Sequence, residues 1–300
     1  MKYPDNNDSD LRLRDFIRQN PPEETSLIDL ISFPSDQGVM LNNGRAGSAL
    51  APELIRARFY NLTPSPAHFE AHTTLLKRVA DQGSVPCEKD LASDQALLGA
   101  KVSQSLQNGS IPVIIGGGHE TAYGHFLGYV EADKPITIFN IVAHTDVRDL
   151  KDGNPHSGSP FRQAIEHASG VCRGYHVFGL NPTSVAIEHD QYVREQGSAH
   201  YIDAFDLNKL LESVRESDTD VMVTMDMDAV DQSHAPGVSA PNANGLNTET
   251  WLKTAFELGK IDNITSFDLC EVNPVYDQDG KTVRLAAITI WYFLLGVALR

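Results

Sequence analysis

The sequence of 300 residues has few cysteines and few basic residues. Its three cysteines, Cys87, Cys172 and Cys270, show no CxxC spacing, so we expect free thiols in a reducing compartment, the cytoplasm, rather than a disulfide scaffold. Only 24 lysines and arginines stand against 40 aspartates and glutamates, which leaves a formal net charge of -16. This charge repels nucleic-acid backbones and anionic lipid surfaces, so neither is a predicted partner.

The sequence also lacks a long hydrophobic segment, a repeat and a flexible linker. The N-terminal stretch MKYPDNNDSDLRLRD is polar and shows no secretory signal. The apolar run LAAITIWYFLLGVALR spans about fifteen residues, fewer than the roughly 20 that cross a bilayer, and it predicts a buried C-terminal helix. We therefore expect one catalytic domain over residues 1–300, with residues 1–25 as a polar extension, and no membrane association.

What the sequence does contain is an alternation of short β-rich runs with amphipathic stretches. The β-rich runs are SLIDLISF, IPVIIGG, ITIFNIV, YHVFGL, VMVTMDM and ITSFDLC, and the predicted helices cover 51–60, 160–169, 206–216 and 248–259. Strands that lack polar alternation and are separated by helices predict βαβ units and a mainly parallel sheet. The predicted fold class is therefore α/β, and ligands of such sheets bind beyond the carboxyl ends of the strands.

Four of the predicted strands run into histidines or acidic residues. GGGHE, AHTD, DMD and DLCEVNP occupy these strand ends. A single histidine or aspartate at such a place is more often a cap or a turn former. In HTD and DMD, however, side chains two positions apart in an extended segment point the same way, so each pair can present two ligands to one point. Imidazole and carboxylate together suit Mn²⁺, with Fe, Co or Zn as alternatives, rather than a thiolate zinc site.

The ordered pieces G-G-G-H, A-H-x-D, M-D-x-D-A-x-D and E-V-N-P resemble the ureohydrolase family, which contains arginase, agmatinase and formimidoylglutamase. The stretch FPSDQGVMLNNGRAGSALAPELIR also resembles the N-terminal pattern of this family. The resemblance implies a three-layer α/β/α sandwich around a parallel sheet, and a homo-oligomer. It further implies a site for two Mn²⁺ ions with the ligands His119, His144, Asp146, Asp226 and Asp228.

The substrate loop resembles one member of the family most closely. Arginase and agmatinase have a His-Gly pair after the ligand loop, whereas Ser157-Gly158 in HSGSPFRQ resembles the S-S-G-T-P-F of formimidoylglutamases. GGGHETAYGHF matches the formimidoylglutamase pattern at the first ligand as well, including His125. The resemblance therefore implies N-formimino-L-glutamate as the small-molecule substrate, with Ser157 as a substrate contact.

Arg148 is the predicted partner of a substrate carboxylate. It lies two residues after Asp146, where arginase contacts the carboxylate of its substrate, and a chain of net charge -16 needs a local cation to hold an anionic substrate. The alternative for Arg148 is a salt bridge with Asp149 or Asp152. For two further arginines, Arg45 and Arg162, we expect structural roles as readily as substrate binding.

The implied reaction yields L-glutamate and formamide, as in histidine degradation. Two divalent ions about 3.5–4 Å apart activate a shared water, which attacks the formimino carbon. By the resemblance, Asp146 holds a metal and accepts a hydrogen bond from the attacking water, while Glu271 pairs with the cationic formimino group and orients it. A role as a loop anchor is the alternative for Glu271.

One position departs from the family pattern. The family strand reads D-A-H-x-D, in which the first Asp bridges both metals, whereas this chain has Val142 there. Asn140 lies about 6–7 Å further back along the strand and cannot replace the missing ligand. We therefore expect a weakened metal site that holds one ion or is partly occupied. Two alternatives stay open: a catalytically impaired binding protein with the ureohydrolase fold, and a hydrolase of guanidines like agmatinase or arginase.

Overall fold

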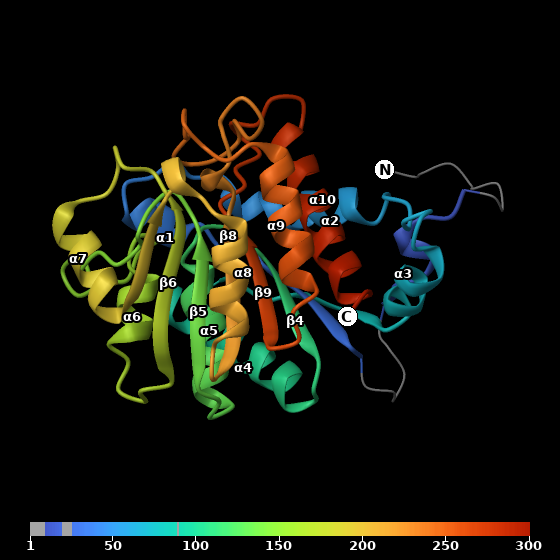
Figure 1. Cartoon of the computed structure of the whole chain (residues 1–300), viewed down its shortest axis with the longest axis horizontal. Coiled ribbons are helices and arrows are strands. Elements are labelled where there is room, and N and C mark those ends of the chain that lie inside the picture. Colours follow the sequence, from blue (N-terminus) through green and yellow to red (C-terminus); the bar gives the residue numbers. More distant parts are fainter. Residues whose placement is uncertain (1–9, 20–25, 89) are drawn as a thin grey trace.

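A computed structural model describes residues 10–19, 26–88 and 90–300 (Figure 1). Its centre is a parallel sheet whose nine described strands follow the order β1-β3-β2-β4-β9-β8-β5-β6-β7. The strands are β1 (Arg18–Gln19), β2 (Ile28–Phe33), β3 (Val79–Ser84), β4 (Ile111–Gly116), β5 (Ile136–Ile141), β6 (Cys172–Leu180), β7 (Gly197–Tyr201), β8 (Asp220–Asp226) and β9 (Ile264–Cys270). The predicted parallel α/β sheet is confirmed.

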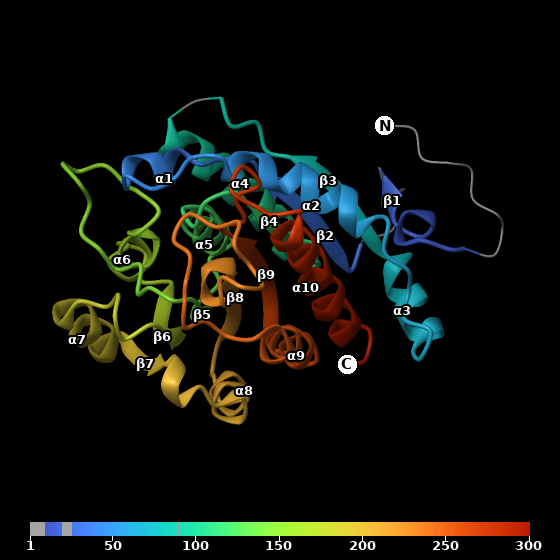
Figure 2. The ribbon, with the colours of Figure 1, turned by 90° about the horizontal axis from the view of Figure 1, so that it is seen from above.

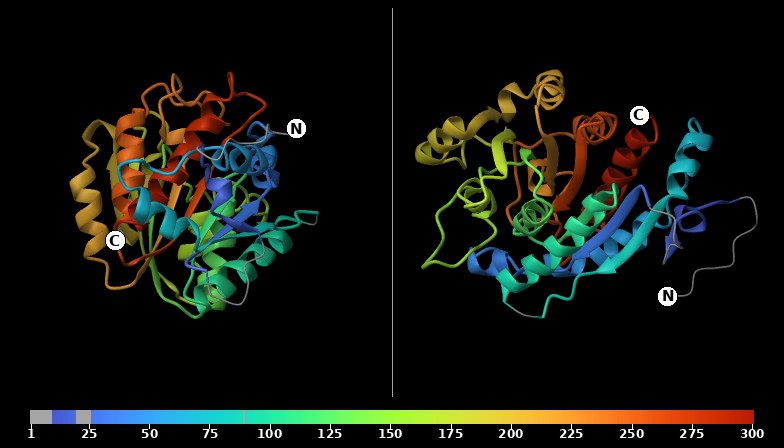
Figure 3. Two further views of the ribbon diagram at one scale, coloured as in Figure 1. Left: turned by 90° about the vertical axis from the view of Figure 1, so that its right-hand side faces the viewer. Right: turned by 90° about the horizontal axis from the view of Figure 1, so that it is seen from below.

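Helices cover both faces of this sheet (Figures 2 and 3). One face is covered by α2 (Ala51–Phe59), α8 (Leu207–Arg215), α9 (Thr248–Gly259) and α10 (Lys281–Val297), and α3 (Phe69–Leu76) contacts α10. The other face is covered by α4 (Leu91–Gln107), α5 (Thr121–Glu131), α6 (Pro160–Ile165) and α7 (Ile187–Gln196). A separate apolar core lies on each face, which explains why the central strands show no polar alternation.

The helices form where the sequence supplies an apolar stripe and a cap. In α8, Leu210, Leu211 and Val214 are buried, and the Asp206 side chain caps the helix by accepting from the backbone N–H groups of its first turn. Helix α10 buries most of its residues between α2 and α9, as predicted for the C-terminal apolar run. Among the described residues, no helix is long and apolar enough to cross a membrane.

The edges of the sheet differ from the prediction. All six predicted strands form, but the edge strands β1 and β7 and the strand β3 next to β1 were not predicted. Of the predicted extension 1–25, residues 10–19 are described and include β1, whereas residues 1–9 and 20–25 lie outside the described residues. Helix α6 ends at Ile165 rather than 169, and the segment that follows it contains Gly170 at φ 62°.

Candidate metal centre and cleft

The predicted ligands come together where four neighbouring strands end. In the sheet these strands lie in the order β4, β9, β8 and β5, although the chain visits them in the order β4, β5, β8 and β9. The residues at or just beyond their carboxyl ends are His119 after β4, Glu271 after β9, Asp226 and Asp228 at β8, and His144 and Asp146 after β5. Parallel strands place these ends at one edge of the sheet, which is where ligands of such sheets bind.

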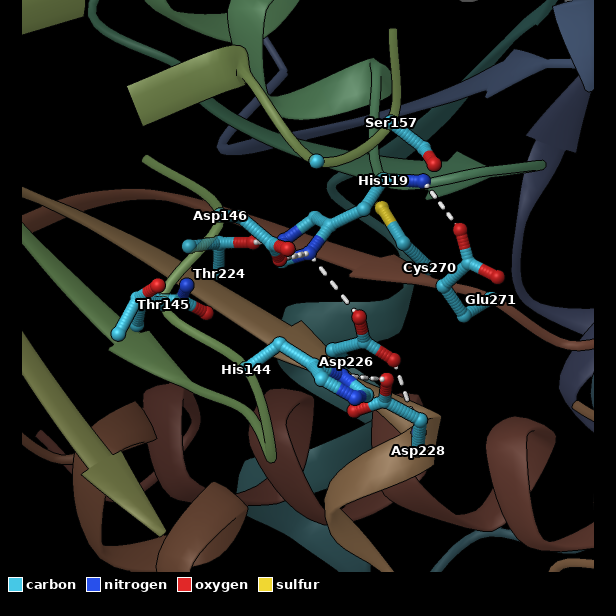
Figure 4. Close-up of polar contacts among 12 residues, drawn as sticks. His119, His144, Thr145, Asp146, Ser157, Thr224, Asp226, Asp228, Cys270 and Glu271 are labelled. Atoms are coloured by element: carbon cyan, nitrogen blue, oxygen red, sulfur yellow. Dashed lines mark hydrogen bonds and ion pairs between the residues drawn. The ribbon is translucent and has the colours of Figure 1, made fainter. Parts of the chain in front are cut away.

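His119, Asp146 and Asp226 form the first group of candidate ligands. The Nδ1 atom of His119 lies 2.9 Å from Oδ2 of Asp146 and 3.0 Å from Oδ2 of Asp226 (Figure 4). The other ring nitrogen, Nε2, lies 2.9 Å from the Thr224 hydroxyl. The imidazole is therefore held at Nε2 while Nδ1 faces two carboxylates, and the three side chains could hold one divalent cation.

His144 and Asp228 form a second group beside the first. His144 Nδ1 lies 2.7 Å from Oδ2 of Asp228, and Oδ1 of Asp228 accepts the backbone N–H of Ala143 at 3.2 Å. Asp226 lies between the two groups, since its Oδ2 faces His119 while its Oδ1 accepts the backbone N–H of Asp228 at 2.8 Å. All five predicted ligands thus lie around one point of the sheet edge (Figure 4).

The electrostatics of this centre favour an added positive charge. Burial, together with the charge of Asp228, raises the pKa of Asp226 to about 7. The adjacent Asp228 carboxylate raises the pKa of His144 to about 10. Burial acts to lower the pKa of His119, but Asp226 and Asp146 raise it well above its usual range. The buried carboxylates thus favour protonation of His119 and His144, and a metal cation at the same place would meet the same attraction.

A buried polar network supports His119 from behind. The Thr224 hydroxyl that faces His119 donates to Oδ1 of Asp268 at 2.7 Å. The other oxygen of Asp268 lies 2.7 Å from Nδ1 of His125, and the thiol of Cys270 donates to Oδ1. Sequence reasoning noted His125 only as part of a motif and missed Thr224 and Asp268. Their signal was a polar side chain in the middle of each apolar run, VMVTMDM and ITSFDLC.

Asp146 and Glu271 occupy left-handed backbone conformations at the centre. Their φ angles are 46° and 68°, values that non-glycine residues rarely adopt. Oε1 of Glu271 accepts the backbone N–H of His119 at 2.7 Å, so this residue anchors the β4–α5 turn and also lines the cleft. Burial, helped by the charge of Asp226, raises the pKa of Glu271 well above its usual range.

Val142 contributes no ligand atom to the centre. It is fully buried, packs in the apolar core on the α4 and α5 face, and donates its backbone N–H to the carbonyl of Phe178. Asn140, the other candidate on this strand, donates to the Tyr175 hydroxyl at 2.9 Å. The segment at the end of β5 therefore contributes only His144 and Asp146 to the candidate ligands.

The candidate ligands line a cleft that also contains the predicted substrate contacts Arg148, Ser157 and Glu271. The lining residues are Asn42, Gly44, His119, His144, Asp146, Arg148, Ser157, Asp226, Asp228, Ser239, Ala240 and Glu271. Of these, Asn42, Gly44, Ser239 and Ala240 were not singled out from the sequence. The motif LNNGRAG contained the first two, but nothing in its letters showed which side chain would face the cleft.

The three arginines separate into one cleft residue and two structural residues. The exposed Arg148 donates to Oδ1 of Asn42 at 3.2 Å, and within the described ranges no carboxylate lies within salt-bridge distance of it, so the alternative pairing with Asp149 or Asp152 is wrong. Arg45 donates from Nε to the Ser239 carbonyl and stacks on Tyr276. Arg162 pairs with Asp149 and Glu166 and stacks on Tyr192.

Comparisons with known proteins show which family the chain is similar to. The model of the Arginase family matches residues 27–296. The formimidoylglutamase of Geobacillus sp. (strain WCH70) is 35% identical over 288 residues, which cover 92% of this chain and 85% of the relative. That of Geobacillus kaustophilus is 37% identical over 267 residues, 86% of this chain and 80% of the relative. The crystal structure of Trypanosoma cruzi formiminoglutamase with Mn²⁺ superposes with a TM-score of 0.88 at 28% identity and covers 97% of this chain and all of the other.

Proposed function

The chain belongs to the arginase family, and on that premise we propose that it is a formimidoylglutamase, a Mn²⁺-dependent hydrolase that converts N-formimino-L-glutamate into L-glutamate and formamide. Relatives that match over most of their length carry the name formimidoylglutamase, and the similar Trypanosoma cruzi structure was determined with Mn²⁺. One catalytic domain carries the whole reaction.

A single observation carries the choice of substrate. The cleft that contains the five candidate metal ligands also contains Arg148, a guanidinium without a carboxylate partner among the described residues. Arginine offers a fork of N–H donors that matches a carboxylate, and N-formimino-L-glutamate carries two carboxylates. Ser157 lines the same cleft, and its hydroxyl contacts Asn42, which also contacts Arg148.

The donor set fits two Mn²⁺ ions, because imidazoles and carboxylates suit this metal. His119, Asp146 and Asp226 would hold one ion, and His144, Asp226 and Asp228 would hold the other. Asp226 would then be the one carboxylate of this set that contributes to both ion sites. When bound, the ions would lower the pKa of a water molecule and so supply the nucleophile at neutral pH.

The chain's own residues orient the other reactants around that water. Asp146 accepts a hydrogen bond from it, since its carboxylate faces His119 at the centre and still borders the cleft. Glu271 pairs with the positively charged formimino group and presents its carbon to the water. The burial that raises the pKa of Glu271 is offset once a cation lies beside the carboxylate. Arg148 and Ser157 hold a substrate carboxylate elsewhere in the same cleft.

We propose further that Val142 weakens the metal site. Without the bridging Asp, three carboxylates carry a charge of about -3 against +4 from two divalent ions, so the mutual repulsion of the ions is less neutralised. One ion or partial loading is then expected in the isolated protein, with activity recovered at high Mn²⁺ by mass action. A catalytically silent binding protein is the second candidate function, because the same valine that weakens loading could abolish turnover.

The test is a substrate comparison with Mn²⁺ added in excess. Formimino-L-glutamate, agmatine and L-arginine are incubated with the full chain, and formamide or urea is measured. Formamide from formimino-L-glutamate alone is the expected result. Urea from agmatine or arginine would assign a guanidine substrate instead, and no product from any of the three would favour the silent binding protein.

A further inference from the structure

Asn42, Arg148 and Ser157 form the part of the cleft that we call the substrate wall. We infer that Asn42 fixes the direction of the hydrogen bonds in this wall, so that Arg148 and Ser157 both present donors to a carboxylate in the cleft. The inference rests on the proposed function for the identity of that carboxylate. It adds a positioning residue that lies in neither the ligand motifs nor the substrate loop.

The Asn42 side chain lies between these two residues. Asn42 directly follows α1 (Gln37–Leu41), and its Oδ1 atom lies 3.2 Å from Nη1 of Arg148. Its Nδ2 atom lies 3.2 Å from Oγ of Ser157. All three residues line the cleft that holds the candidate metal ligands. One amide therefore contacts both predicted substrate-binding side chains.

The direction of these hydrogen bonds follows from the chemistry of arginine. A guanidinium has only N–H donors, so the Asn42 atom that faces Arg148 must be the carbonyl oxygen. The amide NH₂ then faces Ser157, whose Oγ accepts this bond. Among the described residues Ser157 Oγ has no other hydrogen-bond partner, so its own proton is available to the cleft. Arg148 and Ser157 thus both offer donors, which suits an acceptor-only group such as a carboxylate.

The backbone around Asn42 is fixed by buried contacts. The carbonyl of Gly38 accepts the N–H of Asn42 and also that of Ser157, each at 3.0 Å. The N–H of Gly38 donates to Oε1 of the fully buried Glu120 at 2.9 Å, which fastens α1 to the turn that carries His119. Asn42 and Ser157 therefore share one attachment point, and their separation is set before a substrate arrives.

Gly158 provides the space for this arrangement. A Cβ atom at this position would lie 3.1 Å from Cδ of Arg148 and 3.2 Å from Nδ2 of Asn42. Either contact is tight enough to push one partner aside. The glycine after Ser157 thus lets the Arg148 and Asn42 side chains approach each other.

Substitutions at Asn42 should reverse or remove this direction of the hydrogen bonds. In Asn42→Asp both side-chain oxygens accept, so Ser157 turns its proton toward the aspartate and away from the cleft. The new negative charge also repels the substrate carboxylate and pairs with Arg148. In Asn42→Ala neither partner is oriented, but no charge is added. The aspartate variant should therefore lose more affinity than the alanine variant.

The experiment titrates the Mn²⁺-loaded full chain with L-glutamate by calorimetry. We expect Asn42→Asp to bind about ten- to a hundredfold more weakly than the wild type and Asn42→Ala about three- to tenfold more weakly, because a charge-assisted contact is disturbed. Asn208→Asp, which adds the same charge at an exposed position on α8, should bind like the wild type. Mn²⁺ content should be equal in all four proteins.

A double-mutant comparison separates this role from a structural one. Ser157→Ala should weaken binding in the wild-type background and change little in Asn42→Asp, where the hydroxyl proton is already withdrawn. Equal L-glutamate affinity of wild type and Asn42→Asp, additive effects of the two substitutions, or loss of Mn²⁺ in Asn42→Asp would each overturn the inference. Hydrolysis of formimino-L-glutamate by the wild type tests the proposed function separately: Asn42-dependent binding without turnover would keep this inference and refute that function.

Discussion

The two walls of the cleft are built in different ways. The five candidate ligands, which we call the metal wall, lie at or just beyond the ends of adjacent strands. Of these, His119, Asp226 and Asp228 are almost completely buried. The substrate wall consists of side chains on two loops, and its main cation, Arg148, is exposed and makes its side-chain hydrogen bond to Asn42. Strand ends hold ligands in a fixed geometry, whereas loops can change specificity without disturbing the sheet. The difference predicts that the two walls can be damaged separately.

Asp226→Ala should have the largest effect, because it removes the candidate ligand that we propose the two ion sites share. It removes the carboxylate that faces His119 and accepts the N–H of Asp228, so both candidate ion sites lose a ligand. We expect loss of bound Mn²⁺ and of detectable turnover, measured by metal analysis after dialysis and by formamide release. Asp203→Ala, at an exposed aspartate, is the control. An Asp226→Ala protein with stoichiometric Mn²⁺ would refute the ligand assignment.

Val142→Asp should strengthen the same wall. Changes in groups that merely support a ligand alter metal affinity about 10–100-fold, so a restored ligand should tighten the weaker ion by about a hundredfold or more. Without Mn²⁺ the variant should melt at a lower temperature, because another carboxylate is buried in an apolar core.

The informative quantity is the rise in melting temperature on adding Mn²⁺, compared with that of Val142→Asn, which is polar but uncharged. We expect the larger rise, together with faster turnover, for the aspartate variant. If the valine protein already binds two ions tightly and the aspartate variant is no faster, the account of position 142 is wrong.

Arg148→Ala should break only the substrate wall. Loss of a charge-assisted contact to a carboxylate should lower kcat/KM for formimino-L-glutamate about ten- to a hundredfold, with Mn²⁺ content unchanged. Arg162→Ala is the matched control, since that guanidinium is paired with Asp149 and Glu166 and does not line the cleft. Kinetics of Arg148→Ala equal to those of the wild type would reopen the choice of substrate.

The last effect that we predict is a pH dependence confined to the metal wall. The pKa of Asp226 is raised to about 7 and that of His144 to about 10, so below these values Mn²⁺ must displace protons. Apparent affinity should therefore rise with pH, by about tenfold per unit for each proton displaced, between pH 6 and 7. Titrations in the wild type and in Arg148→Ala should show the same slope; a slope that changes in Arg148→Ala would mean that the two walls are coupled.

The central strands could be predicted because their local sequences indicate buried strands without ambiguity. ITIFNIV and VMVTMDM are continuous apolar runs that must be covered on both faces, and both form strands of the sheet. The strands that escaped prediction are at or next to the edges, where β3 reads VADQGS and β7 reads GSAHY. Their partly exposed positions tolerate polar residues and glycine, so composition gave no strand signal.

The sequence by itself determined which residue types follow the strands. The candidate ligands could be found from it, because each of them follows an apolar run and the order of the motifs resembles one family. Only the tertiary structure decided which of these groups meet. It placed Asp226 between His119 and the backbone of Asp228, put Thr224 and Asp268 behind His119, and gave Arg148 the amide of Asn42 rather than a neighbouring carboxylate. The physical reason is distance along the chain. Arg148 and Asn42 are 106 residues apart, and their contact depends on strand order and loop path, which local periodicity does not specify.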